Sequence, residues 1–383
     1  MSKNIKFLAY YLPQYHPIPE NDQWWGKGFT EWTNVVKAKP LFEGHYQPRL
    51  AADLGYYDLR VPEVRAHQAQ LAKDYGVDGF CYYHYWFGNG KKVLERPLEE
   101  VIKFKTPDFP FCVCWANETW KGIWFGGDSK QTLLEQLYPG KQDYIDHFNY
   151  LLPAFKDERY IKIDGKCLFN VYAPYLIDDL DLFVTTFRAC AKEAGIGDLY
   201  LMATRCPENW NPLDYGFDGG VGVSQFTSLR YVTGPLYQTF TRMELLKKRV
   251  KKFFFGEEKL DLDFENRKKP LLVEYKEAIK YLLPPEQYDY DFFPCAVNDW
   301  DNTARAGHKG VVLNNSTPEL WEQHLTEACN YVANNDSEHQ LVFLKSWNEW
   351  AEGNYLEPDA KWGHQYLEVI KRVKEKFNGI KQY

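Results

Sequence analysis

Short runs of apolar residues recur along the chain, and most are followed by turn residues and then by a segment with helical spacing. Runs that are apolar on both faces are typical of parallel strands covered by helices. The predicted strands span residues 5–11, 79–85, 111–115, 168–172, 199–203, 219–223, 292–297 and 341–345. The predicted helices span about residues 61–75, 94–104, 142–155, 182–194, 275–283, 318–333 and 363–377.

Eight strands alternating with helices favour an α/β fold, a closed (β/α)8 TIM barrel formed as a single domain over residues 1–383. Two long loop excursions depart from a minimal barrel, at about residues 13–59 after the first strand and 226–290 after the sixth. An open doubly wound sheet is the alternative. The first strand is followed by LPQYHP rather than by Gly-x-Gly-x-x-Gly, which weakens a dinucleotide-binding version of that alternative.

Composition narrows the class of partner. Hydrophobic residues make up 45% of the 383 residues and charged residues 26%, as expected of a globular protein, and the net charge is −7. That balance argues against a general nucleic-acid binder, which usually carries a basic excess. Aromatic residues are unusually frequent, with 13 Trp, 28 Tyr and 25 Phe, which suits a protein that stacks rings on sugars. The expected partner is a polysaccharide or oligosaccharide, with no nucleic acid and with the oligomeric state left open.

Cysteine usage and hydropathy bear on the compartment. Most of the eight cysteines fall within apolar strand-like runs, where a free buried thiol is the commoner state, so we expect a reducing compartment. The first residues show no hydrophobic signal core, and no apolar run approaches the length of a membrane span. The sequence as given predicts a cytoplasmic protein without a membrane span, and a form trimmed of an export signal stays open.

The most informative motif is the run 346–353, SWNEWAEG, which directly follows the last predicted strand. Glu349 and Glu352 lie three positions apart within it. In a continuing strand such residues point to opposite faces, whereas in a helical turn they share a face. The two carboxylates can act on one sugar only if the chain turns directly after Lys345, and Gly353 supplies turn chemistry just downstream. A solvated glutamate pair on a loop is the alternative interpretation.

Polar and aromatic residues collect at the C-terminal ends of the predicted strands, where barrel enzymes place their chemistry. Glu349 and Glu352 are the candidate catalytic pair. The candidate substrate-binding residues are Tyr11, His16, Tyr83, His84, Trp86, Trp115, Asn117, Glu118, Trp120, Tyr172, Gln225, Asp299, Trp300, Arg305, Trp347, Asn348 and Trp350. Structural roles compete with some of these assignments. His84 is equally well interpreted as a hydrogen-bonded histidine below the rim, and Asp299 as a helix cap or a partner of Arg305.

Four stretches together resemble the WbsX-type proteins that are encoded with bacterial surface polysaccharides. Residues 10–17, 24–32, 115–120 and 346–350 read YYLPQYHP, WWGKGFTEW, WANETW and SWNEW, and the resemblance covers nearly the whole chain. That family is similar, more distantly, to glycoside hydrolase family 99, the endo-α-1,2-mannosidases and mannanases, whose last strand ends in Ser-Phe-Asn-Glu-Trp-His-Glu-Gly. Glu349 and Glu352 match both glutamates, and Ala351 stands where that family has histidine.

The resemblance implies a (β/α)8 barrel and retaining hydrolysis of an α-linked polysaccharide with a manno-configured sugar such as mannose or rhamnose, with no metal and no cofactor. It implies that Glu349 deprotonates the sugar's own 2-hydroxyl, which attacks C1, and that Glu352 serves first as acid and then as base. For these roles Glu352 must hold its proton near neutral pH while Glu349 stays ionised. Two carboxylates this close favour such a split through mutual repulsion.

Two other functions stay open. A glycosyltransferase that assembles a surface polysaccharide such as O-antigen fits the usual label of the family, and metal-dependent transferases commonly carry Asp-x-Asp. Such pairs occur at residues 179–181, 261–263, 289–291 and 299–301. A non-catalytic sugar-binding protein would also use the aromatic rim, although binding alone does not need both glutamates.

Overall fold

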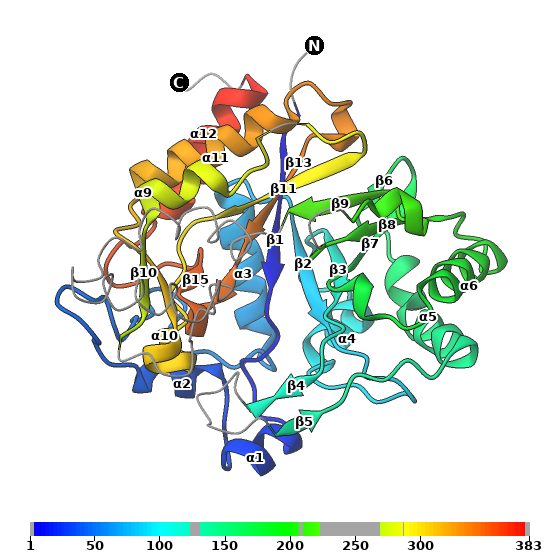
Figure 1. Ribbon diagram of the computed structural model, residues 1–383, viewed down its shortest axis with the longest axis horizontal. Coiled ribbons are helices and arrows are strands. Elements are labelled where there is room, and N and C mark those ends of the chain that lie inside the picture. The colour runs from blue at the N-terminus through cyan, green and yellow to red at the C-terminus, as the bar shows by residue number, and fades with distance from the viewer. Residues whose placement is uncertain (1–3, 123–130, 207–209, 223–268, 286, 380–383) are drawn as a thin grey trace, which may run out of the picture.

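The computed structural model describes residues 4–122, 131–206, 210–222, 269–285 and 287–379. At its centre is a closed barrel of parallel strands (Figure 1). The barrel strands are β1 (Lys6–Tyr11), β2 (Gly79–His84), β3 (Phe111–Trp115), β7 (Lys166–Val171), β8 (Leu199–Ala203), β9 (Gly219–Gly222), β11 (Asp291–Val297) and β13 (Leu341–Lys345). Each strand pairs with the next, and β13 pairs with β1 to close the ring, which confirms the predicted (β/α)8 barrel.

The eight predicted strands all form, and β3, β8 and β13 have the predicted bounds. β1, β2, β7 and β11 differ from the prediction by one or two residues at one or both ends. Residue 223, predicted to end the sixth strand, lies outside the described residues. A short strand β6 (Lys162–Ile163) extends the sheet antiparallel to β7.

Helices cover the outside of the barrel, with α5 and α6 packed together on one side and α11 and α12 on another (Figure 1). The covering helices are α3 (Pro62–Asp74), α4 (Arg96–Phe104), α5 (Lys141–Phe155), α6 (Leu180–Glu193), α11 (Pro318–Val332) and α12 (Gln365–Asn378). Local chemistry explains several of their boundaries. Pro62 stands at the start of α3, where its missing N–H costs no hydrogen bond. The side chains of Asp179 and Thr317 cap α6 and α11.

Side chains along each barrel strand alternate between the barrel interior and the helix layer. Tyr10 points inward and stacks on Tyr83 and Phe343, at ring-centroid distances of 5.3 Å and 5.4 Å. Its neighbour Tyr11 points outward, and its hydroxyl donates a 2.6 Å hydrogen bond to Gln68 of α3. Only the inward set can therefore reach a site at the mouth of the barrel.

The sequence predicted only loop in the first excursion, 13–59, but the structure contains two short helices there. It contains α1 (Pro19–Trp25) and α2 (Glu31–Lys37). These helices are too short for apolar periodicity to reveal them, but Pro19 in the first turn of α1 and the Thr30 capping box of α2 mark their starts. Trp32 of α2 packs against Trp350 at a centroid distance of 5.4 Å, which brings this excursion onto the loop after β13.

The described part of the second excursion holds β10 (Leu271–Glu274) and α9 (Tyr275–Ala278), which continues as a 3-10 turn, η5 (Ile279–Tyr281). β10 pairs in parallel with β12 (Val311–Asn314), a strand that was not predicted, and α10 (Thr303–Ala306) precedes β12. A hairpin of β4 (Trp120–Lys121) and β5 (Thr132–Leu134) follows β3. None of the described helices is long and apolar enough to cross a membrane. All eight cysteine thiols are free.

Candidate active site

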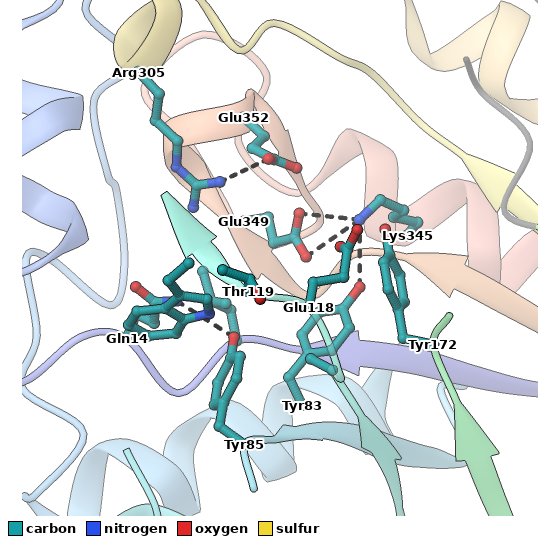
Figure 2. A pocket seen from close by; sticks show the side chains of 13 residues that line it. Gln14, Tyr83, Tyr85, Glu118, Thr119, Tyr172, Arg305, Lys345, Glu349 and Glu352 are labelled. Carbon is teal, nitrogen blue, oxygen red and sulfur yellow. Dashed lines mark hydrogen bonds and ion pairs between the residues drawn. The ribbon is translucent and has the colours of Figure 1, made fainter. Parts of the chain in front are cut away.

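An open pocket lies at the C-terminal ends of the barrel strands (Figure 2). It contains about 730 Å³ of empty space, counting space open to solvent. Its lining consists of Leu12, Gln14, Tyr83, Tyr85, Ala116, Glu118, Thr119, Trp120, Tyr172, Arg305, Lys345, Glu349 and Glu352. Aromatic surface combined with a few convergent charged groups is what a sugar site requires.

The chain reverses at residues 350–353, a few residues after β13, and two glutamates of this segment line the pocket. β14 (Asn348–Glu349) pairs antiparallel with β15 (Asn354–Tyr355), and the 3-10 turn η8 (Trp350–Glu352) lies between them. Glu349 therefore ends a short strand and Glu352 ends the following turn, so that both line the same pocket.

Gly353 fixes this turn. Its φ of +61° is a backbone conformation that side-chain-bearing residues rarely adopt. A Cβ at this position would lie 2.8 Å from Cβ and 2.9 Å from the backbone nitrogen of Asp301. The close approach allows Asp301 N to donate a 2.6 Å hydrogen bond to the carbonyl of Glu352. The loop after β11 thus holds the backbone of Glu352 in place.

Glu349 is buried against a lysine. Lys345 Nζ lies 3.1 Å from Oε2 and 3.3 Å from Oε1 of Glu349. Burial acts to raise the pKa of Glu349, but the charge of Lys345, assisted by Glu352 and Arg305, outweighs it and holds the pKa below the ordinary value. Glu349 is therefore an ionised carboxylate at neutral pH.

The pKa of Glu352 is shifted in the opposite direction. Burial and then the charge of Glu349 raise the pKa of Glu352 to about 8, although Arg305 opposes the shift. Arg305 Nη1 lies 2.6 Å from Oε1 of Glu352, while its Nη2 and Nε donate to Oε2 of Glu31 at 2.9 Å and 3.1 Å. Because burial and the charge of Glu349 outweigh the effect of Arg305, Glu352 keeps its proton at neutral pH.

Glu118 also lines the pocket and is paired with Arg205, whose Nη1 lies 2.7 Å from Oε1 of Glu118. Burial raises the pKa of Glu118, and the charge of Arg205 partly offsets this effect. Beside it, the rings of Tyr83 and Tyr172 meet edge to face at a centroid distance of 6.2 Å.

The pocket brings together a subset of the residues that the sequence singled out. These are Glu349, Glu352, Tyr83, Glu118, Trp120, Tyr172 and Arg305. Gln225 lies outside the described residues. The remaining candidates lie in supporting layers of the described chain and not in the pocket lining, for the physical reasons given below.

Tyr11 and His84 face the helix layer because they alternate with inward-facing strand residues. His84 Nε2 lies 2.9 Å from Nε2 of His147 on α5, and burial lowers the pKa of His84 to about 3. The alternative interpretation of His84, a hydrogen-bonded histidine below the rim, therefore agrees with its position.

Trp86 and Trp115 also pack under α5. Trp86 stacks on His147 at 4.8 Å, and its indole nitrogen donates a 3.0 Å hydrogen bond to Asp143. Trp115 donates from its indole nitrogen to the carbonyl of Trp86 at 2.9 Å. Both side chains tie the ends of β2 and β3 to the helix layer.

Asn117 and Asn348 bridge neighbouring loops rather than facing the pocket. Asn117 Oδ1 accepts from Ala173 N at 2.8 Å while its Nδ2 donates to Ala173 O at 2.8 Å. Asn348 makes the same paired contact with the backbone of Leu12, at 2.7 Å and 3.0 Å. Each asparagine satisfies a backbone donor and acceptor where a strand has ended.

Trp347, Trp350 and His16 are buried outside the pocket lining. Trp347 is fully buried and meets Phe80 at 5.2 Å. Trp350 stacks on Tyr355 at 3.7 Å. His16 is 2% exposed, and burial lowers its pKa to about 4.

Asp299 and Trp300 lie behind the pocket wall. Asp299 Oδ2 is 2.6 Å from Nη1 of Arg49, so its partner is Arg49 and not Arg305. Trp300 is 3% exposed, and its ring lies 5.5 Å from Lys345 Nζ. Asp301 accepts from Gln47 at 2.7 Å.

The Asp-x-Asp pairs have structural surroundings where they are described. Asp299 and Asp301 are tied to the first excursion as above, Asp179 caps α6, and Asp291 accepts a hydrogen bond from Tyr200. The pair at 261–263 lies outside the described residues. Within the described ranges no group of three or more His, Cys, Asp or Glu side chains could hold a metal ion.

Sequence reasoning missed several members of the site. Lys345 was treated only as the end of a strand, although its inward position follows from alternation with the buried residues of β13. Tyr85 and Gln14, joined by a 3.3 Å hydrogen bond, also line the pocket. Glu31 lies in the motif at residues 24–32 but was not among the candidate site residues, because spacing along the chain does not show that α2 reaches Arg305.

Comparisons with known proteins agree with this picture. Residues 7–370 match the family described as Glycosyltransferase WbsX. Two proteins of Xanthomonas campestris pv. campestris, each named Uncharacterized protein WxcX, are 35% and 37% identical over 367 residues, which is 96% of this chain and 49% of theirs. The chain therefore spans about half the length of these relatives.

Solved structures of low sequence identity share the fold. Two structures of the family 99 endo-alpha-mannosidase from Bacteroides thetaiotaomicron are similar to this chain, with TM-scores of 0.56 and 0.54 at 13% and 15% identity. The first alignment covers 99% of this chain and 98% of the solved chain, and the second covers 97% of each. This likeness shows a common barrel fold. The match over nearly the whole sequence shows more: the chain belongs to the WbsX family.

Proposed function

We propose that the protein is a retaining glycoside hydrolase that cleaves an α-linked surface polysaccharide at a manno-configured sugar, mannose or rhamnose. The observation that carries the proposal is the pair Glu349 and Glu352. The two share one pocket, and their surroundings shift their pKa values in opposite directions. Pairs of titratable groups with such divergent environments are typical of acid and base assignments in glycosidases.

In the first step, ionised Glu349 takes the proton of the sugar 2-hydroxyl as that oxygen attacks C1. Protonated Glu352 gives its proton to the glycosidic oxygen, and the bond from C1 to that oxygen breaks. The product is a 1,2-anhydro sugar, which forms without a bond to the protein. Both proton transfers need a carboxyl group in the protonation state that its surroundings favour.

In the second step, Glu352 is a carboxylate and takes a proton from water, whose oxygen attacks C1. The bond between O2 and C1 breaks, and Glu349 returns its proton to O2. Two inversions at C1 give retention of configuration. The step restores the starting protonation states of both glutamates, so the cycle can repeat.

The rest of the pocket supports sugar binding. Trp120 meets Tyr85 edge to face at 5.2 Å, and together with Tyr83 and Tyr172 they supply ring surface next to the glutamates. Ring surface of this kind buries the apolar faces of a sugar. The polar groups near it are placed to bind hydroxyls.

A glycosyltransferase of surface polysaccharide assembly is the second candidate, and the observation that favours it is the family's description. A transferase needs a site for a sugar donor. Asp299 and Asp301 are occupied by partners from the first excursion, which speaks against their use for that purpose.

The test incubates wild type, E349Q and E352Q with a panel of bacterial surface glycans and α-mannans and analyses the released sugars by mass spectrometry. Titration calorimetry with nucleotide sugars, with and without manganese, runs in parallel. We expect wild type to release oligosaccharides and both variants to release them at least about 100-fold more slowly. Micromolar binding of a nucleotide sugar without glycan cleavage would instead support the transferase.

A further inference from the structure

Lys345 is a buried cation held at the base of the pocket. It is 3% exposed, and both oxygens of Glu349 face its ammonium group. Tyr83 OH lies 3.4 Å from the same nitrogen. The rings of Tyr83 and Trp300 lie 5.8 Å and 5.5 Å from it. The aromatic surroundings leave the ammonium little freedom to turn away from Glu349.

Stability does not explain this pair. Taking both charges out of water costs several kcal/mol per ion, and replacement of such a pair by apolar groups is often neutral or stabilising. Phe343, two positions earlier on β13, also points into the barrel, so a hydrophobic residue at position 345 would continue the pattern of this strand. The ion pair is therefore better explained by what it does to Glu349.

We infer that Lys345 is a positioning residue that keeps Glu349 charged and so determines which of the two glutamates is the base and which is the acid. The inference rests on the proposed function for the meaning of those two roles. Its physical content is separate: without Lys345, Glu349 would be a buried carboxylate beside a second carboxyl group, and the preference for ionising Glu349 rather than Glu352 would weaken.

Other charged and titratable groups also face Glu349, from several elements. They are Arg305 of α10, Glu31 of α2, Glu352 of η8, Tyr83 at the end of β2, Tyr85 and Tyr172 beyond β2 and β7, and Cys295 of β11. Arg305 is the other cation among them, and it is already shared by Glu31 and Glu352. Lys345 is the cation that contacts both oxygens of Glu349.

The test compares K345M, which removes the charge and keeps the length of the side chain, with K345R, which keeps the charge. Carbon-13 NMR of glutamate carboxyl groups follows the titration of Glu349, whose signal is assigned by its absence in E349Q. K280M serves as the control, because Lys280 is half exposed and pairs with Glu277 on the surface. We expect Glu349 to titrate at higher pH in K345M and near its wild-type pH in K345R and K280M.

A second readout covers the case in which K345M does not fold. In E349Q the Lys345 ammonium loses its anionic partner, so its NMR signal, labelled at Cε and assigned by its absence in K345R, should titrate at lower pH than in wild type. Coupling between two sites is reciprocal, so this shift reports the same interaction. Unchanged titration of Glu349 in K345M, or of Lys345 in E349Q, would overturn the inference.

Activity separates the two proposals. If wild type hydrolyses a glycan, the acid limb of its pH–rate profile should move to higher pH in K345M. If no glycan is cleaved but Glu349 still titrates higher in K345M, the role of Lys345 stands and the hydrolase proposal fails. Reduced activity in K345M with an unshifted acid limb and an unshifted Glu349 signal would mean that Lys345 acts only in packing.

Discussion

Arg305 Nη1 lies 2.6 Å from Oε1 of Glu352, so the carboxyl group proposed as the acid is paired with a buried cation. A cation favours the ionised form, yet burial and the charge of Glu349 prevail and raise the pKa of Glu352 to about 8. Arg305 also donates two hydrogen bonds to Glu31.

This balance predicts the alkaline limb of the pH–rate profile. The acid must be protonated, so kcat/KM should be steady near neutral pH and fall as the pH rises through about 8, where Glu352 loses its proton. On the acid side, activity should persist below the ordinary range of a glutamate, because the pKa of Glu349 is lowered. The measurement is kcat/KM across pH, with circular dichroism at each pH to show that the protein stays folded. A rate that rises steadily through pH 8 and beyond would contradict the assignment of Glu352.

Replacement of Glu352 by glutamine should remove proton donation but keep the size of the side chain. General acid catalysis contributes roughly 10²–10⁴-fold, so kcat/KM of E352Q should fall by about that factor while the cleaved oligosaccharide still binds. Steady-state kinetics and calorimetry measure the two quantities. E322Q is the matched control, because Glu322 forms a surface ion pair with Arg372. Activity of E352Q close to that of E322Q would rule out Glu352 as the acid.

Arg305 should also contribute to stability through Glu31, which is fully buried. R305M leaves this carboxylate without its cation, and breaking a buried ion pair by removing one partner costs about 3–5 kcal/mol in the free energy of unfolding. The double variant E31Q/R305M removes both charges and should recover part of that loss. Urea unfolding of wild type, E31Q, R305M and the double variant completes the cycle. Additive losses in the double variant would show that the two side chains are not coupled.

Gly353 tests whether the turn between the glutamates is as tightly held as its surroundings indicate. G353A adds a Cβ at 2.8–2.9 Å from Asp301 in a left-handed conformation, so we expect a loss of about 2–4 kcal/mol in stability and reduced kcat. G379A is the matched control: Gly379 also has a positive φ but open space around it, so its cost should be about 1 kcal/mol. Equal losses in the two variants, by urea unfolding, would mean that Asp301 does not constrain the turn.

The barrel could be predicted from the sequence because its strands are short apolar runs with clear ends, such as Phe111–Trp115 and Leu341–Lys345. The carboxylate pair could be recognised because Glu349 and Glu352 lie in one motif. The rest of the site depends on side-chain direction and on contacts between distant segments, which the spacing of residues along the sequence does not show. Strand alternation turned His84 towards α5, and α2 brought Glu31 behind Arg305.

Several tryptophans near the predicted site lie outside the pocket lining. Trp115, Trp347 and Trp350 are close in sequence to residues that line the pocket, yet each is almost fully buried in a supporting layer. The backbone conformation at a tryptophan decides whether its side chain points into the pocket or into the layer behind it. Composition and motif spacing do not specify that direction.

The most direct test of the proposed hydrolysis is proton NMR of the anomeric signals during the first moments of glycan cleavage by wild type, before mutarotation. We predict that the first product released from an α-linked manno-configured glycan has the α configuration, and that E349Q and E352Q release product at least about 100-fold more slowly. First release of the β anomer would contradict the two-step route through the 1,2-anhydro sugar.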